Sequence, residues 1–440
     1  MFIGYHILIK FFKDGNIENN WKKEEYLKFE KNSIEGDLQG IIEKLDYLQD
    51  LGIDLIYLGP IYESKTTHGY DTINYYKIAS HLSSKEENKR NEVLKKLLIE
   101  SHKRGIKVIL DLVLNHASKN YDMKSIKNFN VKTEPPQSIQ EKRWQTLFQF
   151  WNISDIETRK FLIDVGKYWL ENFDVDGFRL DHALGIERSF WKEFSKEMKK
   201  IKSDVILLGE VWDDVADEEE NYELIKKFKS FENEKIFTSL FDFFIYDVLK
   251  DVFIEKNKSL KDFYKMISKS NELNDTHFNL TYFVENHDVP RFIDLCKNKE
   301  IFFNVMKVLM VITGNVMLEY GNEIALAGDK NFEWFHESGR VPMKFKKNWN
   351  LKEIETFNLI KKLIKIRKEN KELSDGSYEL IYSSDDSILF KKKLNKKETF
   401  VLITFKTFKA DYEFEDLISN EKEINIFEPG VYYLKRVHFF

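Results

Sequence analysis

Segments typical of buried strands alternate with segments typical of helices along most of this 440-residue chain. Short apolar runs bounded by polar residues predict eight strands, at residues 5–12, 55–58, 108–114, 177–180, 205–209, 237–241, 280–284 and 316–318. Helical periods lie between them, for example at residues 37–52, 90–105 and 156–173, and several end on a glycine, as helices often do. Eight strand-helix units predict an α/β protein with a (β/α)8 TIM barrel.

Two stretches interrupt this alternation. Residues 116–152 contain adjacent prolines and aromatic residues without a clear period, so we expect a short subdomain inserted after the third strand. After residue 373 the pattern changes to short alternating runs, at residues 378–384, 387–394, 399–406 and 430–436. We therefore expect a barrel at 1–373, interrupted by the insert at 116–152, and a small antiparallel β domain at 374–440.

Three carboxylates stand where predicted strands end: Asp181 in GFRLDHA, Glu210 in LLGEVW and Asp288 in FVENHD. In a parallel barrel these strand ends meet on the face where functional groups gather. A glycosidase needs one carboxylate to attack the sugar carbon, a second to protonate the leaving oxygen, and can use a third to hold substrate hydroxyls. The alternative is that these acids form ordinary ion pairs at strand ends. The placement of all three favours a glycosidase.

Composition excludes several partners. The chain has 69 Lys+Arg against 74 Asp+Glu, and a net charge of -5 offers no field for nucleic acid. No apolar run approaches about 18 residues, so we expect no membrane span. Cys296 is the single cysteine, which excludes an intramolecular disulfide, and the apolar N-terminal run is broken by His6 and Lys10, as in a first strand rather than a leader. We expect a cytoplasmic protein, with its oligomeric state open.

The order of the motifs resembles the α-amylase family of glycoside hydrolases over nearly the whole chain. Residues 34–64 are similar to the family's first helix and second strand, HGYDTINYY at 68–76 to the following loop, and DLVLNH at 111–116 to its third-strand motif. GFRLDHA, GEVW and FVENHD match three further signatures, and YGNEI and RVPM resemble the segments around strand eight. The resemblance implies the same barrel and a glycosidase activity.

Carried over residue by residue, the resemblance makes Asp181 the nucleophile, Glu210 the general acid/base and Asp288 the stabilising aspartate. We expect a raised pKa for Glu210 from apolar neighbours such as Trp212 and from nearby negative charge, while Arg179 keeps Asp181 ionised. Trp212, two residues after the acid, is a candidate for the leaving-group side.

The resemblance also implies a set of substrate-binding residues: His68, Tyr70, Asp71, His116, Arg179, His287 and Trp212. His116 and His287 look like the family's two histidines that donate hydrogen bonds to the sugar at the cleavage point. Tyr70 looks like the ring that stacks under that sugar, and His68 and Asp71 either shape the loop or contact the substrate. Asp111 resembles the family's aspartate that supports the site through the arginine.

The chain departs from the family before residue 156. The family's usual Leu-Pro-Asp-Leu-Asn segment, whose aspartate is a calcium ligand in many members, reads QFWNISD here and places Phe150 where that carboxylate would stand. Asn115 matches another usual ligand, but one amide oxygen cannot hold an ion that takes 6 to 8 oxygens. We therefore expect no cofactor and no structural calcium. The aromatic residues of the insert, Trp144, Phe148, Phe150 and Trp151, are either sugar platforms or its own small core.

Three functions follow from these features. The first is an intracellular, retaining α-amylase-type hydrolase that cuts α-1,4 bonds in maltooligosaccharides or starch-derived dextrins. The second is a 4-α-glucanotransferase, which shares the covalent intermediate but resolves it with a sugar hydroxyl instead of water. The third is an inactive barrel that binds carbohydrate or acts as a scaffold, and the presence of all three carboxylates argues against it. Preferred chain length, cleavage pattern and α-1,6 activity are left open.

Overall fold

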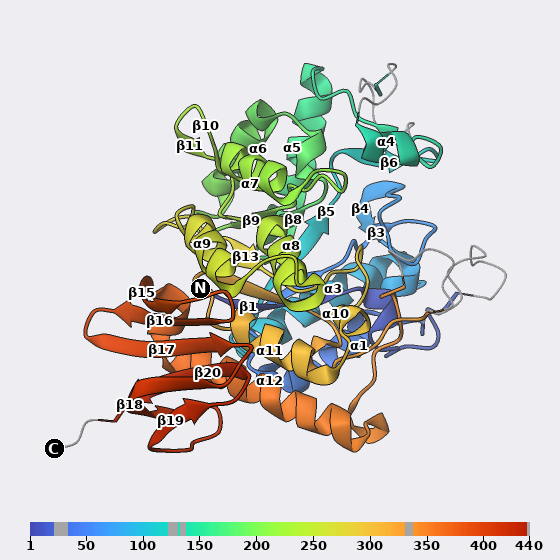
Figure 1. The fold of residues 1–440 in the computed structure, drawn as a ribbon. Helices are drawn as coiled ribbons and strands as arrows, with labels where there is room; N and C mark the ends of the chain where they lie inside the picture. The colour runs from blue at the N-terminus through green and yellow to red at the C-terminus, as the bar shows by residue number, and fades with distance from the viewer. Residues whose placement is uncertain (22–33, 122–130, 133–137, 331–337, 438–440) are drawn as a thin grey trace. The chain divides into compact units, whose positions relative to one another are not determined.

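The computed structural model describes residues 1–21, 34–121, 131–132, 138–330 and 338–437. Within these residues, eight strands form one sheet in the order β12-β9-β8-β5-β2-β1-β14-β13 (Figure 1). Their bounds are β1 Ile3–Ile7, β2 Leu55–Leu58, β5 Lys107–Leu112, β8 Gly177–Leu180, β9 Ile206–Gly209, β12 Ser239–Leu240, β13 Thr281–Tyr282 and β14 Asn315–Glu319. All eight predicted strands are present, and the predicted (β/α)8 barrel is confirmed.

The first strand ends earlier than the sequence predicts. β1 pairs with β2 only from Gly4 to Ile7, and Ile9–Phe11 forms a turn of 3-10 helix. Both segments are buried. The apolar run therefore continues past the last hydrogen bond of the strand, which is why it looks like one longer strand in the sequence.

The chain divides into two compact units, Gly4–Phe241 with Arg340–Met343, and Met1–Ile3 with Asp242–Gly339 and Lys344–Phe440. The helices of the first unit are α1 Leu38–Ile42, α2 Leu45–Leu51, α3 Glu87–Lys103, α5 Ile156–Asn172, α6 Arg188–Ile201 and α7 Glu218–Lys229. Figure 1 shows α5, α6 and α7 grouped beside β8 and β9. The boundary at residue 373 stays a prediction.

Helix ends in the first unit carry capping residues, and one of the glycines noted in the sequence ends a helix. Asp155 caps α5, because its carboxylate accepts the N–H of Thr158 at 2.9 Å. Asp217 and Glu220 form a reciprocal capping box at the start of α7. Gly52 ends α2 with a φ of 97°, a left-handed conformation that favours glycine. These local preferences place the helices between successive strands.

The insert after β5 is small. It contains β6 His116–Ser118 and β7 Phe148–Phe150, an antiparallel pair, and α4 Ile139–Trp144, which Ser138 caps. Residues 122–130 and 133–137 of the predicted insert lie outside the described residues. Two further short strand pairs decorate this unit: β3 Tyr62–Glu63 with β4 Asn74–Ile78, and β10 Ser230–Phe231 with β11 Glu234–Lys235.

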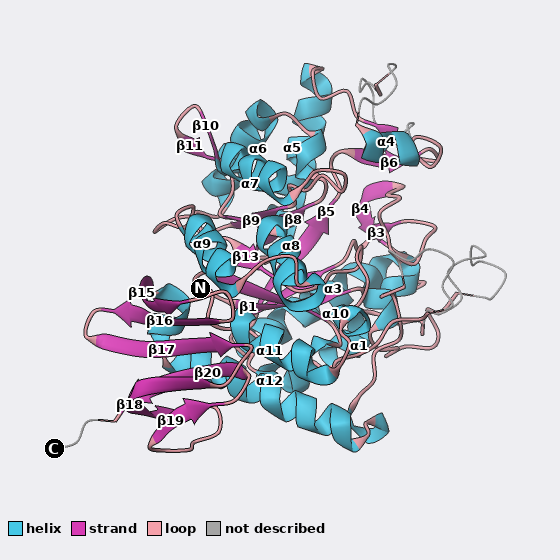
Figure 2. Cartoon of the chain, viewed as in Figure 1, coloured by secondary structure: helices cyan, strands magenta, loops and turns pink. Residues whose placement is uncertain are grey.

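The second unit contains the last part of the barrel and the C-terminal sheet (Figure 2). Its helices are α8 Phe243–Lys250, the π-helix Asp251–Glu255, α9 Leu260–Asn271, α10 Phe292–Leu295, α11 Lys299–Leu309, α12 Leu351–Glu369 and α13 Lys371–Asp375. The antiparallel sheet has the order β15-β16-β17-β20-β18-β19. Its strands are β15 Ser377–Ser383, β16 Ser387–Leu394, β17 Lys397–Thr404, β18 Phe408–Asp416, β19 Ile424–Phe427 and β20 Gly430–Arg436.

Four of these six strands correspond to the alternating runs in the sequence, and β18 and β19 are additional. The residues of β18, FKADYEFED, alternate between apolar and polar types, so the same rule would also have predicted this strand. The predicted C-terminal antiparallel β structure is confirmed.

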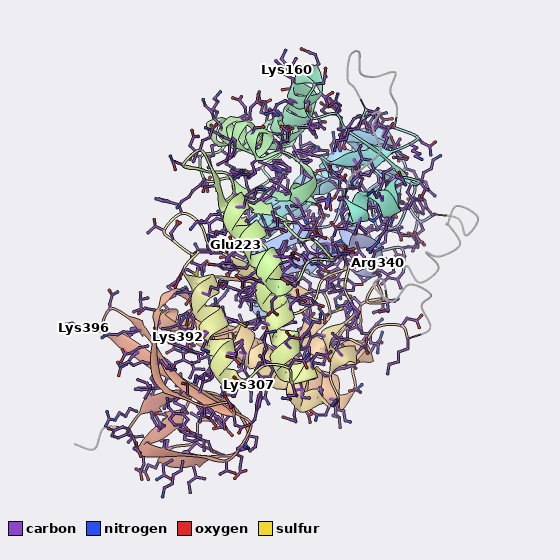
Figure 3. All side chains as sticks on the ribbon, turned by 45° about the horizontal axis from the view of Figure 1, so that its top comes forward. Lys160, Glu223, Lys307, Arg340, Lys392 and Lys396 are labelled. Atoms are coloured by element: carbon purple, nitrogen blue, oxygen red, sulfur yellow. The ribbon has the colours of Figure 1, made fainter. Side chains whose placement is uncertain are left out.

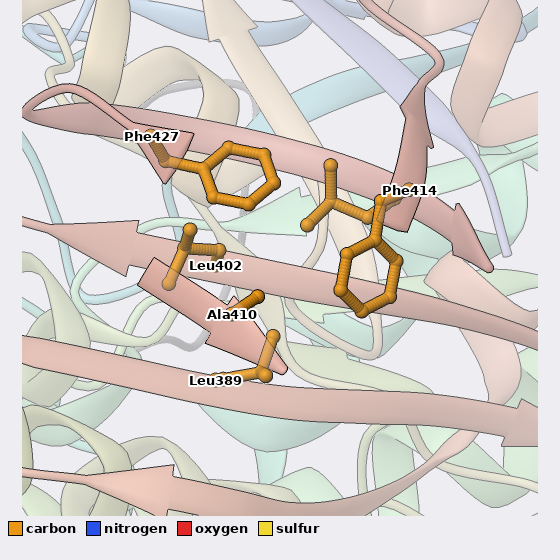
Figure 4. Packing of buried hydrophobic residues seen from close by; sticks show 6 residues of the cluster. Leu389, Leu402, Ala410, Phe414 and Phe427 are labelled. Carbon is orange, nitrogen blue, oxygen red and sulfur yellow. The ribbon is translucent and has the colours of Figure 1, made fainter. Parts of the chain in front are cut away.

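One face of this sheet packs on other elements of the same unit. The Tyr433 hydroxyl donates to the Lys307 carbonyl of α11 at 2.5 Å. Lys392 is fully buried, and its ammonium lies 3.7 Å from the centre of the Tyr378 ring. Figure 3 shows Lys392 within the unit, whereas the exposed Lys396 lies at the outer end of the hairpin of β16 and β17. The opposite face carries its own apolar cluster (Figure 4): Leu389, Leu402, Ala410, Phe414, Phe427 and Leu434.

Candidate active site

Arg179 on β8 is 1% exposed, and its guanidinium contacts carboxylates from three strands. Nη1 lies 3.0 Å from Oδ1 of Asp111 on β5 and 2.6 Å from Oδ1 of Asp181, the residue that follows β8. Nη2 lies 2.5 Å from Oε1 of Glu210, the residue that follows β9. Asp111 is the direct partner of Arg179 in the β5–β8 register, and β9 is the next strand of the sheet. The fold therefore brings three acids to one cation.

Asp111 is fully buried and holds two tyrosine hydroxyls. Tyr57 of β2 donates to Asp111 Oδ2 at 2.5 Å, and Tyr70 donates to the same oxygen at 2.7 Å. Burial raises the pKa of Tyr57 well above its ordinary value, so this hydroxyl stays a donor. Both tyrosine rings also lie within 6 Å of the Arg179 guanidinium, at 5.8 and 5.9 Å. Asp111 thus fixes the position of Arg179 and of Tyr70.

The turn after β8 holds Glu210 by its backbone. His182 adopts a left-handed conformation with a φ of 39°, and its N–H donates to Glu210 Oε2 at 2.9 Å. The Ala183 N–H donates to the Glu210 carbonyl at 2.8 Å. The His182 ring meets Trp144 of the insert edge to face, with ring centres 5.1 Å apart, and its Nε2 lies 4.0 Å from Glu141 Oε1. The insert therefore packs directly on the residue that positions Glu210.

The cluster carries more negative charge than Arg179 can balance. Burial raises the pKa of Asp181 well above its ordinary value, and the charges of Glu210 and Asp111 act in the same direction. From the sequence we expect Arg179 to keep Asp181 ionised; its guanidinium does lower this pKa, but burial and the two carboxylates outweigh it. Burial lowers the pKa of Arg179, yet the charges of Asp111 and Glu210 hold it well above its ordinary value. Burial and the two neighbouring carboxylates therefore favour the protonated form of the Asp181 carboxyl group.

Two neutral imidazoles border the cluster. His116, the first residue of β6, stacks on Phe148 with ring centres 4.3 Å apart. Burial lowers the pKa of His116 to about 3 and that of His182 to about 4. Both ring nitrogens of His116 lack a hydrogen-bond partner among the described residues, and so does Nε2 of His182. These buried nitrogens can pair with hydroxyl groups of a ligand.

His68 and Asp71 brace the loop that carries Tyr70. Nδ1 of His68 accepts the N–H of Tyr70 at 3.1 Å, and the two rings lie 24° from parallel. The Asp71 carboxylate accepts the N–H of Lys65 at 3.1 Å and the hydroxyl of Thr66. Both residues shape the loop through these bonds.

Asp288 and His287 follow β13 in the second compact unit. The His287 ring is buried, and its Nε2 lies 3.0 Å from Asp288 Oδ2. The Asp288 N–H donates to Asn286 Oδ1 at 2.8 Å, and a third of the Asp288 side chain is exposed. A buried ion pair frames this segment, because Arg291 Nη1 lies 2.7 Å from Glu285 Oε1. The loop thus presents one carboxylate beside one imidazole.

Comparison with known proteins assigns the chain to a family. The family described as alpha amylase, catalytic domain, matches residues 6–356. This chain belongs to the alpha-amylase family. It is a glycoside hydrolase that acts on α-glucans, and the resemblance of the motifs is confirmed.

Individual members of the alpha-amylase family are similar over most of the chain. Alpha-amylase 2 of Dictyoglomus thermophilum is 30% identical over 97% of this chain and 74% of that protein. The intracellular maltogenic amylase of Bacillus subtilis is 30% identical over 84% of this chain, which spans only 61% of that relative. The α-amylase of Geobacillus thermoleovorans, solved in complex with acarbose, has a TM-score of 0.80 and 26% identity, and 99% of this chain and 98% of that chain are covered.

Three residues of the alpha-amylase-family site were not singled out from the sequence. Tyr57 lies in an apolar run, LIYL, that reads as plain core. His182 directly follows Asp181, and this position was its one signal. Glu141 had none, because α4 does not continue the strand-helix alternation. Trp212, which was singled out, is half-buried beyond Glu210.

The aromatic residues of the insert divide into two pairs. Phe150 and Trp151 are buried, and Trp151 Nε1 donates to the Tyr75 hydroxyl at 3.1 Å, so both belong to the core. Trp144 and Phe148 are half-buried and flank His182 and His116. Phe150 and Trp151 therefore form the small core of the insert, and a role of Trp144 and Phe148 as sugar platforms stays a prediction.

The calcium position of many alpha-amylase-family members does not fit here. Phe150 is buried beside His116, and the Asn115 amide donates to Glu141 Oε1 at 3.1 Å. The loop at residues 14–20 offers more side-chain oxygens, the ligand atoms that a hard cation prefers, than this position does. Asn19 Oδ1 and Asn20 Oδ1 are buried without a hydrogen-bond partner in the described part of the chain, and the Asp14 carboxylate accepts the Asn20 amide at 3.0 Å. These residues could contribute to a cation site.

None of the helices in the described ranges is long and apolar enough to cross a membrane. This agrees with the absence of a long apolar run in the sequence.

Proposed function

We propose that this member of the alpha-amylase family hydrolyses α-1,4 bonds in maltooligosaccharides or starch-derived dextrins with retention of configuration. The observation that carries the proposal is the arrangement around Arg179. Asp181 and Glu210 contact the two terminal nitrogens of one guanidinium at 2.6 and 2.5 Å. Such an arrangement supports a short separation of the carboxyls, and retaining enzymes need roughly 5 to 5.5 Å.

In the proposed mechanism, Asp181 attacks the anomeric carbon while Glu210 donates its proton to the glycosidic oxygen. The bond between that carbon and the oxygen breaks, and a glucosyl ester of Asp181 forms with inverted configuration. Glu210 then takes a proton from water, whose oxygen attacks the same carbon and releases Asp181. The second inversion restores the α configuration.

The reaction needs Asp181 ionised and Glu210 protonated at the same time. The raised pKa of Asp181 supports one extra proton in the coupled carboxylates, and the required state has that proton on Glu210. We assign Arg179, fixed by Asp111, to positioning both acids. In this proposal His116, His287 and Tyr70 bind the sugar at the cleavage point, Trp212 lies toward the leaving group, and Asp288 holds hydroxyls of the distorted ring.

The test combines a variant with the stereochemistry of the product. Glu210→Gln should lower kcat on maltooligosaccharides by about 10²- to 10⁴-fold, as loss of an acid/base does. Glu193→Gln on the exposed face of α6 is the matched control and should leave kcat unchanged. NMR of the first product of the wild-type chain should show the α anomer. A β anomer would exclude the retaining mechanism.

A 4-α-glucanotransferase is the second candidate. The half-buried Trp144 and Phe148 beside the two imidazoles support it, because aromatic rings there could seat a second sugar in place of water. Chromatography of the products from maltotriose distinguishes the two. Glucose and maltose alone support hydrolysis, and longer oligomers support transfer.

We also propose that the protein acts in the cytoplasm on an α-glucan oligosaccharide. The relative from Bacillus subtilis that is named an intracellular maltogenic amylase supports this location. Fractionation of the native cells with an antibody to the chain would test it, and detection mainly in the medium would contradict it.

A further inference from the structure

The C-terminal sheet carries a groove of about 610 Å³ on the face of its apolar cluster. Buried Leu389, Ala410 and Phe414 line it, between β15 and β18. Three strands separate β15 from β18 in the sheet, yet the rings of Tyr382 and Phe408 lie 5.3 Å apart. The sheet therefore curves so that its edge strand β15 comes close to β18, and the groove lies between these two strands.

A bulge in β15 turns Tyr382 toward the groove. Leu380 pairs with Phe390, whereas Tyr382 pairs with Leu389, so one residue is looped out between them. Paired residues of neighbouring strands lie on the same face of a sheet. Because Leu389 belongs to the apolar cluster, the bulge places Tyr382 on the face of the groove. Without the bulge, Tyr382 would share the face of Leu380.

A larger irregularity in β18 holds the second tyrosine. Lys409 pairs with Ile426 and Phe414 with Ile424, so residues 410–413 lie outside regular pairing. Tyr412 is within this stretch, lines the groove and is 53% exposed. The Arg436 guanidinium lies 3.6 Å from the centre of its ring, which fixes the plane of the ring. Bulges commonly re-aim side chains next to functional sites, and here both flanks of one groove use them.

The lining favours a neutral ligand with both apolar faces and hydroxyl groups. Its charges balance, because the charged lining residues are two lysines and two aspartates: Lys406, Lys409, Asp386 and Asp411. Lys406 and Asp386 form an ion pair with each other, so neither recruits a charged ligand alone. Tyr382 is 46% exposed and offers a flat apolar ring with a polar end. Ser384 and Thr407 add hydroxyls.

We propose that this groove binds a stretch of α-glucan chain and is a second glucan site, formed by residues other than those around Arg179. Sugar rings stack on Tyr382 and Tyr412, and their hydroxyls pair with the polar lining. The volume lies in the range of about 300–1,000 Å³ that small-molecule sites occupy, so it suits a few sugar units rather than a long helix of glucan. The choice of glucan as the ligand rests on the proposed function. The groove would hold polymers and leave the cleavage of short substrates unaffected.

The test uses the full chain in native gels that contain amylopectin. Wild-type protein should be retarded, and the double variant Tyr382→Ala/Tyr412→Ala should lose at least two thirds of that retardation. Leu380→Ala is the matched control, because Leu380 is 43% exposed on the same strand but does not line the groove. Turnover of a nitrophenyl maltotrioside should be equal in wild type, the double variant and the control.

Each outcome bears on one proposal. Equal retardation of wild type and the double variant overturns the second site, whatever the activity. Selective loss of retardation supports it, and this holds even if the wild type fails to cleave the maltotrioside, a result that would count against the proposed function alone. If the double variant instead changes from dimer to monomer in light scattering with no change in retardation, the groove binds a second copy of the chain and the glucan proposal is wrong.

Discussion

Replacement of Asp111 by asparagine should move the pH profile of this enzyme to lower pH. Asp111 and Asp181 share Nη1 of Arg179 at 3.0 and 2.6 Å, so these two oxygens are at most about 5.6 Å apart, the sum of the two distances. At an effective dielectric constant of about 20, two unit charges at this separation interact by about 3 kcal/mol, which corresponds to about 2 pKa units.

Asp111 raises the pKa of Asp181, so removal of its charge stabilises the ionised form and lowers that pKa. The acid limb of kcat/KM should therefore move down by about 1 to 2 pH units, since screening reduces the full value. The assay is kcat/KM for a nitrophenyl maltooligosaccharide across the pH range. The absolute rate should also fall, because Tyr70 and Arg179 lose their shared acceptor.

Asp176→Asn is the control for this experiment. Asp176 directly precedes β8 and is also buried, with its carboxylate accepting the Val108 N–H at 2.8 Å. The Asp176→Asn variant should be less stable than the wild type but should keep the wild-type pH profile of kcat/KM. An acid limb that stays in place in Asp111→Asn, or that moves to higher pH, would refute the proposed coupling of the carboxylates.

Three further predictions concern stability. His116→Gln should make the free energy of unfolding less dependent on pH. The pKa of His116 is lowered to about 3 in the folded chain, so below about pH 6.5 the unfolded chain binds an extra proton and the free energy of unfolding falls by about 1.4 kcal/mol per pH unit. Urea unfolding at two pH values measures this. An unchanged difference between the two pH values would contradict it. Gly185→Ala should lower the free energy of unfolding by about 1–3 kcal/mol and lower kcat, because the new Cβ would lie 2.6 Å from His182 Cδ2 and 2.8 Å from Asn115 Oδ1. A variant with the Tm and kcat of the wild type would show that the turn accommodates the methyl group without strain. Arg291→Met should lower the free energy of unfolding by about 3–5 kcal/mol, because it leaves the buried Glu285 without its cation. The double variant Arg291→Met/Glu285→Leu should recover part of this loss in denaturant melts. A double variant no more stable than the single one would argue against an unpaired charge.

The sequence predicts the barrel well because its strands are buried on both faces and so form plain apolar runs. Asp181 and Glu210 could be identified because each ends such a run. Tyr57 could not, since its hydroxyl reaches Asp111 only through the pairing of β2 with β5, which is a contact between distant segments. The ion pairs that raise or lower a pKa also depend on burial, and this is why the shift of Asp181 differs from the expectation based on Arg179 alone.

Local conformation limited the rest. A left-handed backbone is uncommon for any residue other than glycine, although histidine adopts it more often than most, and nothing in GFRLDHA indicates it at His182. The bulges of β15 and β18 are defined by the pairing of each strand with its neighbour, and the residues of one strand alone do not specify that pairing. Both features are maintained by tertiary contacts, and both lie where the chain turns a side chain or an N–H toward a site.

The position of Arg179 between three acids has a consequence for how the chain assembles. Asp111 and Arg179 are 68 residues apart, and the carboxylates of β5, β8 and β9 repel one another until this one cation is in place. A partly folded chain that buried these strand ends without Arg179 would enclose unpaired charge. We therefore expect β5, β8 and β9 to close in one cooperative step, which native-state hydrogen exchange would show as a common opening free energy for their amides. The guanidinium of Arg179 would then also determine at which step of folding this part of the barrel can exclude water.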